Sequence, residues 1–342
     1  MRVETRADAA QTARVVAHHR DRYIVRLPEG DVDAHLPGRL RHTISSPDEL
    51  PAVGDWITVV RQSGDPPLAI IQGVLPRRSA FRRKTAGDVT APQVVAANVD
   101  IAFIAAALPD DINLRRIERY LTLAWESGST PVVLLTKSDL VGDAGEFIRD
   151  VRSVAPGVDV IAVSALTRSG TDAIAAILTA GVTAVVLGSS GAGKSTLVNA
   201  LLGEDRQRVG EVRDDGAGRH TTTHRELIEL PGGASLIDTP GMRELQLWSA
   251  ADGIEETFRE IATLAEECRF RDCAHVTEPG CAVLAAVERG TLDSARLDSW
   301  RNLQRELAYL ERRQDAAATA AAKSVARSAE YLLRSRLREK YE

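Results

Sequence analysis

The chain has 342 residues, 44% of them apolar, which is enough to fill the cores of two or three domains. Its formal net charge of −5 at pH 7 excludes a uniformly basic protein that binds nucleic acid over its whole surface. The N-terminus lacks the apolar segment of a secretory signal, and apolar runs such as 99-VDIAFIAAAL-108 reach only about half of a membrane span. We therefore expect a cytoplasmic protein with no membrane partner.

Residues 10–75 have the pattern of a small all-β domain. Short apolar stretches at 13–18, 22–28 and 56–62 alternate with turn clusters, and no helical period competes with them. About five short strands in this length predict a barrel of the OB or SH3-like type, although another small β-domain gives the same pattern.

The stretch 77-RRSAFRRK-84 follows the predicted barrel and is strongly basic. A solvated linker is the ordinary explanation of such a run, but it also offers contacts for RNA phosphates. The candidate contacts are Arg77, Arg78, Arg82, Arg83 and Lys84.

From Val99 onward, apolar strands alternate with helices. Strands are predicted at 99–107, 131–136, 158–163, 182–187, 223–230 and 234–238, and helices at 112–127, 144–154, 170–179 and 194–202. The first of these helices begins after Asp110 and Asp111. Strands that are apolar throughout are typical of a parallel sheet covered on both faces, so this region predicts an α/β sheet with helices on both sides.

The stretch 184-AVVLGSSGAGKSTLVNALL-202 matches a phosphate-binding loop between a strand and a helix. In such a loop, glycines let backbone N–H groups face the phosphates, Lys194 reaches the β- and γ-phosphates, and the Ser195 hydroxyl binds Mg²⁺. The nucleotide-binding residues predicted here are Gly188, Ser189, Ser190, Gly191, Ala192, Gly193, Lys194, Ser195 and Thr196.

Two later segments complete the phosphate side of the site. In 238-DTPG-241, Asp238 is expected to hold Mg²⁺ through water, and the Gly241 N–H to meet the γ-phosphate. Between the loop and this segment, 216-GAGRHTTTHRE-226 is a Gly-rich approach to three threonines. One of the three is expected to bind Mg²⁺, and Thr222 is slightly favoured over its neighbours.

Two guanine-reading segments precede the phosphate loop, whereas in an ordinary GTPase they follow it. In 132-VVLLTKSDL-140, Asp139 accepts guanine hydrogens that adenine lacks, and the Lys137 stem covers the base. Thr136 stands where Asn is more usual and can make fewer hydrogen bonds. In 163-VSALTRSG-170, Ser164 and Ala165 match the box whose Ala N–H donates to guanine O6. Every box follows a strand, where open α/β sheets bind ligands, so the order indicates a circular permutation.

All three cysteines lie within 268-CRFRDCAHVTEPGC-281. An odd count in a chain without an export signal argues against disulfides. Cys268, Cys273, His275 and Cys281 supply four soft or borderline ligands with no spare position, which predicts one closed, structural Zn²⁺ site. The alternative is three buried thiols beside a surface histidine. The rest of the chain after residue 250 is predicted to be helical, near 252–266, 281–289 and 294–338.

The set of motifs strongly resembles the ribosome small-subunit-dependent GTPase A family (RsgA, also called YjeQ). The resemblance rests on 98-NVD-100, LLTKSDL, GSSGAGKSTLVNALL, GRHTTT, DTPGMRE and the Cys/His cluster, in a permuted order that follows a β-barrel, and it covers nearly the whole chain. It implies a GTPase that binds the small ribosomal subunit late in assembly, hydrolyses GTP to GDP and phosphate faster there, and then leaves.

The catalytic residues we expect are Lys194 and His220. A Ras-type GTPase has a Gln soon after DxxG that orients the attacking water, but Met242 directly follows DTPG here. A neutral imidazole at His220, beside the threonines, can accept a proton from water, and the family resemblance indicates the same residue. The alternative is a solvent-facing His220 and a catalytic group supplied by the ribosome.

We therefore expect three domains: an OB-type, RNA-binding β-barrel at 1–85, a circularly permuted α/β P-loop GTPase domain at 86–248, and a mainly helical zinc-binding domain with a basic C-terminal helix at 249–342. The expected ligands are GTP or GDP with Mg²⁺, one Zn²⁺, and the small subunit with its rRNA, bound by a monomer. The alternatives are a permuted GTPase serving the large subunit or another RNA, and a nucleotide-gated RNA-binding module with incidental hydrolysis. A third alternative, an ATPase, is disfavoured because Asp139 reads guanine.

Overall fold

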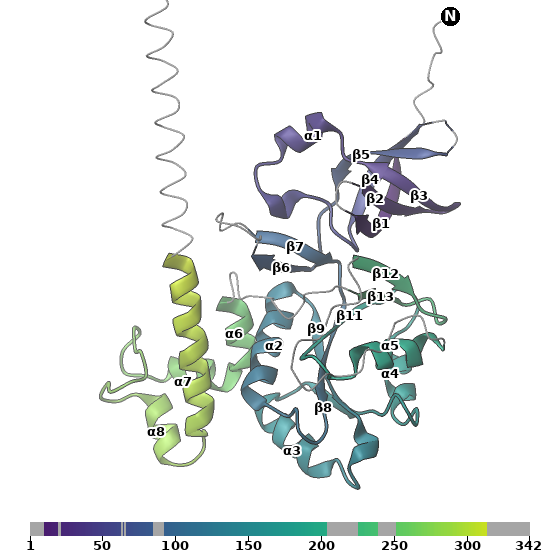
Figure 1. Ribbon diagram of the computed structural model, residues 1–342. Coiled ribbons are helices and arrows are strands. Elements are labelled where there is room, and N and C mark those ends of the chain that lie inside the picture. Colours follow the sequence, from purple (N-terminus) through teal and green to yellow (C-terminus); the bar gives the residue numbers. More distant parts are fainter. Residues whose placement is uncertain are drawn as a thin grey trace, which may run out of the picture.

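The computed structural model describes residues 10–19, 22–62, 64, 66–84, 92–203, 225–238 and 251–312. Figure 1 shows a small β-barrel from the N-terminal part, a central sheet flanked by helices, and C-terminal helices packed beside α2. Among the helices in these ranges, none combines the length and apolar character that crossing a membrane requires.

Five strands form the N-terminal barrel, and they are β1 (Gln11–His19), β2 (Arg22–Leu27), β3 (Gly30–His35), β4 (Trp56–Gln62) and β5 (Leu68–Val74). They neighbour one another in the order β1-β2-β3-β5-β4, and β4 pairs back onto β1. Val15, Ile57 and Ile71 are fully buried inside the barrel. The short α1 (Gly38–Thr43) and η1 (Pro47–Glu49) connect β3 to β4. The predicted OB-type barrel is confirmed.

The central sheet is the predicted α/β sheet. Its strands are β8 (Ile101–Ala107), β9 (Thr130–Thr136), β10 (Asp159–Ala162), β11 (Thr183–Gly188), β12 (Arg225–Glu229) and β13 (Ser235–Asp238). Their order is β10-β9-β8-β11-β13-β12, with parallel pairing from β10 to β13 and an antiparallel β12.

Both faces of this sheet are covered by helices. The helices α2 (Leu114–Ser127) and α3 (Gly145–Val154) lie on one face, and α4 (Thr171–Ile177) and α5 (Lys194–Leu202) on the other (Figure 1). Successive residues of β9 alternate between the two cores: Val133 and Leu135 pack on the α2 side, and Val132 and Leu134 on the α5 side. This two-sided burial explains why the strands are apolar throughout.

The barrel is joined directly to the central sheet. Strand β1 pairs with β12 through Ala17 opposite Glu226 and His18 opposite Arg225, so that eleven strands form one continuous sheet. The hairpin of β6 (Ala80–Lys84) and β7 (Pro92–Ala97) lies beside this junction (Figure 1). A Cβ at Gly54 would lie 2.1 Å from the Ala97 carbonyl oxygen, so this backbone contact requires glycine.

The basic run at 77–84 is partly a structural element of the barrel. Arg77 donates to both carboxylate oxygens of Asp55 at 2.8 Å, and Asp55 is 0% exposed. Because a buried carboxylate needs a hydrogen-bonded cation, Arg77 has a role in the fold, and its contact with RNA phosphate stays a prediction. Arg78 pairs with Asp100 at 3.1 Å. The side chain of Lys84 lies outside the described residues.

The C-terminal region is helical, as predicted. It contains α6 (Ala251–Thr257), α7 (Arg259–Glu266), α8 (Ala282–Glu288) and a helix over 294–312 of the described chain. A Cβ at Gly253 of α6 would lie 2.5 Å from the Thr122 carbonyl oxygen of α2, so the two helices pack with their backbones close together. The C-terminal region therefore packs on the outer side of α2, the helix that covers this face of the sheet.

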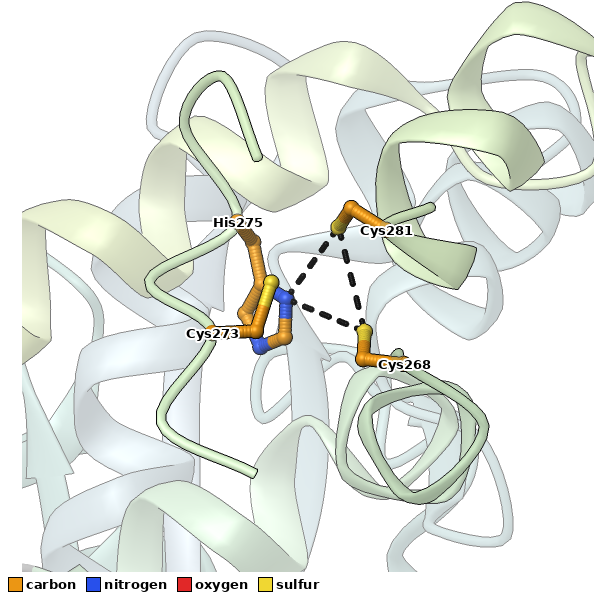
Figure 2. Close-up of side chains that lie close together, drawn as sticks. All are labelled: Cys268, Cys273, His275 and Cys281. Carbon is orange, nitrogen blue, oxygen red and sulfur yellow. Dashed lines mark hydrogen bonds between the residues drawn. The ribbon is translucent and has the colours of Figure 1, made fainter. Parts of the chain in front are cut away.

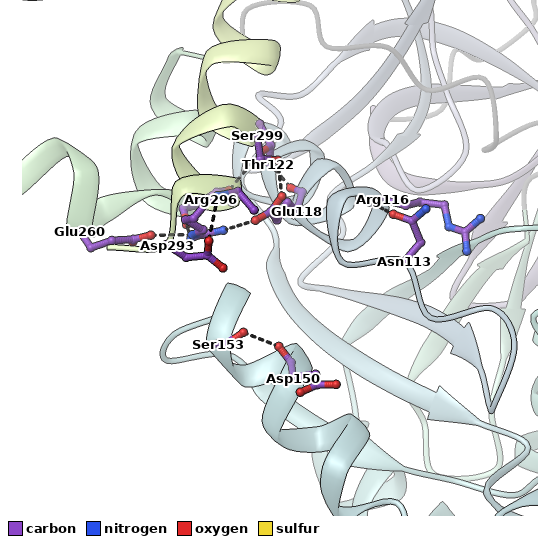
Figure 3. A network of polar contacts seen from close by, with 12 residues as sticks. Asn113, Arg116, Glu118, Thr122, Asp150, Ser153, Glu260, Asp293, Arg296 and Ser299 are labelled. Carbon is purple, nitrogen blue, oxygen red and sulfur yellow. Dashed lines mark hydrogen bonds and ion pairs between the residues drawn. The ribbon is translucent and has the colours of Figure 1, made fainter. Parts of the chain in front are cut away.

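A buried polar network joins the C-terminal helices to α2 (Figure 3). The Arg296 guanidinium donates to Glu118 of α2 at 2.7 Å, to Glu260 at 2.6 Å and to the Thr257 carbonyl at 2.5 Å. Ser299 donates to the second carboxylate oxygen of Glu118. Arg296 and Glu118 side chains are only 5% and 3% exposed. Each charge is therefore paired and hydrogen-bonded, which is the condition for burying an ion pair.

We expect Arg296→Met to lower the free energy of unfolding by about 3–5 kcal/mol, because it leaves the Glu118 carboxylate buried without a cation. The measurement is urea unfolding followed by circular dichroism. Arg305→Met removes an exposed arginine from the same helix and should change the midpoint little. The double variant Glu118→Leu/Arg296→Met should regain most of the loss. Equal midpoints for Arg296→Met and Arg305→Met would contradict the stabilising role.

Candidate functional site

The predicted phosphate loop joins β11 to α5. Gly188 ends the strand with a φ of 144°, and a Cβ there would lie 2.4 Å from the Ala105 carbonyl oxygen of β8. The Lys194 ammonium group donates to the carbonyls of Gly188 at 3.0 Å and Ser189 at 2.5 Å, so the loop curls around its own lysine. The loop ends at Gly193, the residue before the first turn of α5. A loop that curls over a helix N-terminus is the geometry that binds phosphate.

The guanine-reading box at the end of β9 lies against this loop. The Thr136 hydroxyl donates to the Ala192 carbonyl of the loop at 2.8 Å and is buried. The short side chain of Thr136 therefore does tether the box, although Asn is the more usual residue. Asp139 follows in η2 (Ser138–Leu140), after Lys137 with a φ of 57°.

The second guanine-reading box meets the first. The Ser164 hydroxyl donates to the Asp139 carboxylate, and the Ser138 N–H donates to the Val163 carbonyl at 3.2 Å. Ser164 is fully buried, and Ala165 follows it in a turn. The structure thus links both base boxes and the phosphate loop through consecutive hydrogen bonds from β10 to β9 to β11.

Asp238 ends β13, next to β11, and faces Glu226 across the strand pair. Burial raises the pKa of the Asp238 carboxyl, Glu226 raises it further, and Lys194 lowers it. Because β13 pairs in parallel with β11, the end of β13 and the phosphate loop that follows β11 lie at the same edge of the sheet. A half-buried carboxylate at this edge, together with the Ser195 hydroxyl, suits Mg²⁺, a cation that prefers oxygen ligands.

Three predicted residues lie outside the described part of the chain, namely His220, Thr222 and Gly241. Their roles remain predictions. The other predicted nucleotide-binding residues lie at the ends of β9, β10, β11 and β13, in the segments that follow these strands, or in the first turn of α5.

Asp111 is a contact of the phosphate loop that the motifs did not indicate. The Ser189 hydroxyl donates to its carboxylate, and Arg116 of α2 donates to its carbonyl at 2.7 Å and to its carboxylate. The sequence analysis placed Asp111 only at the start of a helix. Its position shortly after a strand of the predicted parallel sheet was the one feature that could have indicated a place near the phosphate loop.

The four predicted zinc ligands converge (Figure 2). Their ligand atoms all lie within 4.8 Å of one another. The Cys268 and Cys281 sulfurs are 3.8 Å apart, and the His275 Nδ1 lies 3.6 Å and 3.4 Å from them. Tetrahedral zinc with ordinary Zn–S and Zn–N bonds requires edges of about 3.8 Å and about 3.6 Å, whereas a disulfide requires about 2 Å. The geometry therefore fits a Cys₃His metal centre and excludes a Cys268–Cys281 disulfide.

The loop around this centre is held in shape by Glu278. Its carboxylate accepts from the backbone N–H groups of Val276 at 2.7 Å, Thr277 at 3.0 Å and Ala274 at 3.1 Å. The hydrogen bond from Val276 leads the contributions that lower the pKa of Glu278 to about 2. Burial lowers the pKa of His275, which favours the neutral imidazole that binds a metal. The structure describes one group of ligands suited to a metal, and it is the group predicted.

Comparison with known families shows that the family model described as RsgA GTPase matches residues 74–248. A curated protein of Streptomyces avermitilis, named small ribosomal subunit biogenesis GTPase RsgA, is 50% identical over 303 residues, which cover 86% of this chain and 81% of that protein. A protein of the same name from Opitutus terrae is 49% identical over 312 residues, covering 89% and 85%.

Two solved structures have the same fold. The crystal structure of YjeQ from Thermotoga maritima matches with a TM-score of 0.66 and 25% identity, covering 88% of this chain and 99% of that one. YloQ, described as a circularly permuted GTPase, matches with a TM-score of 0.62 and 22% identity, covering 90% and 98%. The second likeness supports the fold alone.

We expect Cys273→Ser to reduce bound zinc from about one ion per chain to well below half, because three ligands no longer close the site. Thr277→Ala changes an exposed residue of the same loop and should leave the metal content unchanged. Zinc is measured by plasma mass spectrometry after dialysis. Limited proteolysis should cut the Cys273→Ser variant faster than its parent in the region after residue 265, because the bound metal supplies folding energy there. Full zinc content in Cys273→Ser would contradict the assignment.

We expect Asp238→Asn to stabilise the nucleotide-free protein at pH 7 while lowering Mg²⁺-dependent turnover at least tenfold. A raised pKa means that the folded state favours the protonated carboxyl, so the charged form opposes folding once the pH exceeds that pKa. The advantage of Asn should therefore shrink as the pH falls through the raised pKa toward the ordinary value.

The measurement is the thermal midpoint of both proteins as a function of pH. Asp159→Asn is the matched control, because Asp159 is exposed at the opposite end of a parallel strand. A stability difference between Asp238→Asn and its parent that grows on acidification would contradict the argument.

Proposed function

This chain belongs to the RsgA GTPase family, and we propose that it hydrolyses GTP to GDP and phosphate on the small ribosomal subunit during late maturation of that subunit. GTP hydrolysis is the activity of the family. We propose the small subunit as partner because the relatives from Streptomyces avermitilis, Opitutus terrae and Oceanobacillus iheyensis are each named as small ribosomal subunit biogenesis GTPases. The observation that carries the proposal is the chain of hydrogen bonds that links Asp139, Ser164, Thr136 and the phosphate loop.

Within the site, we assign the base to β9 and β10 and the phosphates to β11 and β13. Asp139 accepts from guanine, Lys137 covers the ring, and Ala165 donates to guanine O6, while Lys194 and the loop N–H groups hold the phosphates. Ser195, Asp238 and Thr222 would hold Mg²⁺, and the ion supplies neutralisation of charge on the β- and γ-phosphate oxygens. The Thr136–Ala192 hydrogen bond supports this assignment because it sets the distance between the base pocket and the phosphate loop.

We propose that His220 accepts a proton from the attacking water, or orients it. The argument is chemical: Met242, next to the DTPG segment, can neither donate nor accept usefully, and His220 adjoins the threonines expected at the γ-phosphate. A catalytic group from the ribosome is the alternative, and the experiment below separates the two.

The remaining assignments concern the whole chain. We propose that the Cys₃His centre holds one structural Zn²⁺, that the barrel binds rRNA, and that the protein acts as a cytoplasmic monomer. The proposed domains are 1–85, 86–248 and 249–342, and the hairpin β6–β7 lies across the first of these boundaries. The names of the relatives support the small subunit over the large subunit as partner.

The test is phosphate release from GTP by the full chain, alone and with purified small or large ribosomal subunits. We expect the small subunit to raise turnover at least tenfold and the large subunit to leave it within about twofold, because relatives of this sequence carry the small-subunit name. Asp139→Asn should lose GTP turnover and gain turnover of xanthosine triphosphate. Equal stimulation by both subunits, or by neither, would overturn the proposal.

The same assay tests the catalytic group. His220→Ala should lower subunit-stimulated turnover at least tenfold while GDP binding is retained, since general acid–base groups contribute roughly 10²–10⁴ in rate. His224→Ala, on the other side of the threonines, is the matched control. If His220→Ala stays within about twofold of the parent, the ribosome supplies the group.

A further inference from the structure

The phosphate loop is anchored from outside by a carboxylate. Ser189, the first residue after Gly188, donates its hydroxyl hydrogen to Asp111, which lies between β8 and α2. The loop is also tied at its other end, where the Ala192 carbonyl accepts from Thr136. A glycine-rich loop has more conformational freedom than other segments, so two fixed points, one on β9 and one in the segment after β8, restrict it strongly.

The anchoring carboxylate is itself held in one orientation. One Asp111 oxygen accepts from Ser189 and the other accepts from Arg116, which also donates to the Asp111 carbonyl at 2.7 Å. The Asn113 side chain caps α2 by accepting from the Arg116 N–H at 3.0 Å (Figure 3). Both oxygens are therefore engaged, and the donor that orients them lies in the first turn of α2.

Helix α2 in turn is a rigid support. Its other side carries Glu118, whose two carboxylate oxygens accept from Arg296 and Ser299 of the C-terminal helix in a buried network. Thr122 of α2 and Thr257 of α6 are hydrogen-bonded at 3.1 Å. Asp111 lies in the segment that leads from β8 into α2 and is held by Arg116 of α2, so the carboxylate that contacts the phosphate loop is supported by a helix with fixed neighbours.

The charge of Asp111 also needs explaining, because a bare carboxylate beside a phosphate site repels the nucleotide. The ion pair with Arg116 offsets this charge, and the side chains of Arg116 and Asp111 are 35% and 27% exposed. The carboxylate can then act as a strong hydrogen-bond acceptor without weakening anion binding. This combination suits a support for the loop and gives the phosphates no direct ligand.

We propose that Asp111 is a positioning residue of the phosphate loop, which holds the Ser189 hydroxyl so that the loop keeps its phosphate-binding shape before the nucleotide arrives. Pre-shaping removes part of the ordering cost of binding, so it raises affinity for GDP and GTP alike. The inference rests on the proposed nucleotide site.

The test is the affinity of the full chain for GDP carrying a methylanthraniloyl fluorophore, measured by fluorescence titration. We expect Asp111→Ala and Ser189→Ala each to weaken binding about three- to tenfold, as loss of one charge-assisted hydrogen bond predicts. Because both remove the same bond, the double variant should bind no more weakly than the weaker single variant. Asp111→Asn keeps one acceptor oxygen for Ser189 but lacks the charge and the second acceptor, so it should weaken binding less than Asp111→Ala, while Asp110→Ala at the exposed neighbouring position should stay within about twofold.

Affinity of Asp111→Ala within about twofold of the parent, or losses of the two single variants that add in the double variant, would overturn the proposal. The thermal unfolding midpoint of each variant is also measured without nucleotide. If Asp111 has a merely structural role, Asp111→Ala lowers this midpoint and leaves the affinity for GDP unchanged. Ser189→Ala removes the bond without disturbing Arg116, so the comparison holds even if Asp111→Ala does not fold. A parent chain that does not bind the labelled GDP refutes the nucleotide site itself, which is a separate result.

Discussion

In a parallel β-sheet every strand ends at the same edge, whatever its place in the chain. This constraint determines the candidate site, because β9, β10, β11 and β13 each end at a predicted nucleotide box. Strand β8 lies between β9 and β11, and the residues that follow it reach the phosphate loop through Asp111. Circular permutation changes the order in which the strands are made and leaves their neighbours unchanged, so the site survives it.

The same sheet determines where the other two regions attach. Strand β12 ends the central sheet, and an uncovered edge strand offers unpaired backbone groups to other chains. Here β1 of the barrel covers that edge, and the salt bridge from Arg26 to Glu229 at 2.8 Å reinforces the contact. The C-terminal helices use a different surface, the outer side of α2. The barrel and the Cys/His cluster are therefore attached to separate parts of the central domain.

The motifs that the sequence revealed are those whose chemistry depends on close spacing. The phosphate loop, the Asp139 box and the Cys/His cluster each lie within a few residues, so composition and order were enough to predict them. Strand β3 was not predicted individually, because 30-GDVDAH-35 is mostly polar and buries only Ala34. The pair of Glu118 and Arg296 lies 178 residues apart, and no local pattern relates them. The ion pair of Arg77 with Asp55 was not predicted, because a run of charges in the sequence does not distinguish a buried ion pair from a solvated face.

A series of contacts through α2 connects the Cys/His cluster to the phosphate loop. Next to the Cys/His cluster, Arg301 donates to the His275 carbonyl, and Arg296 of the same helix pairs with Glu118 of α2. In the first turn of α2, Arg116 pairs with Asp111, which contacts the phosphate loop. Helices and buried pairs transmit position, but they report the nucleotide state only where an element has two arrangements. Since α2 is held on both sides, it fixes the C-terminal region relative to the phosphate loop. Strand β12 differs, because it pairs with the Asp238 strand on one side and with β1 of the barrel on the other, and so connects the end of β13 directly to the barrel.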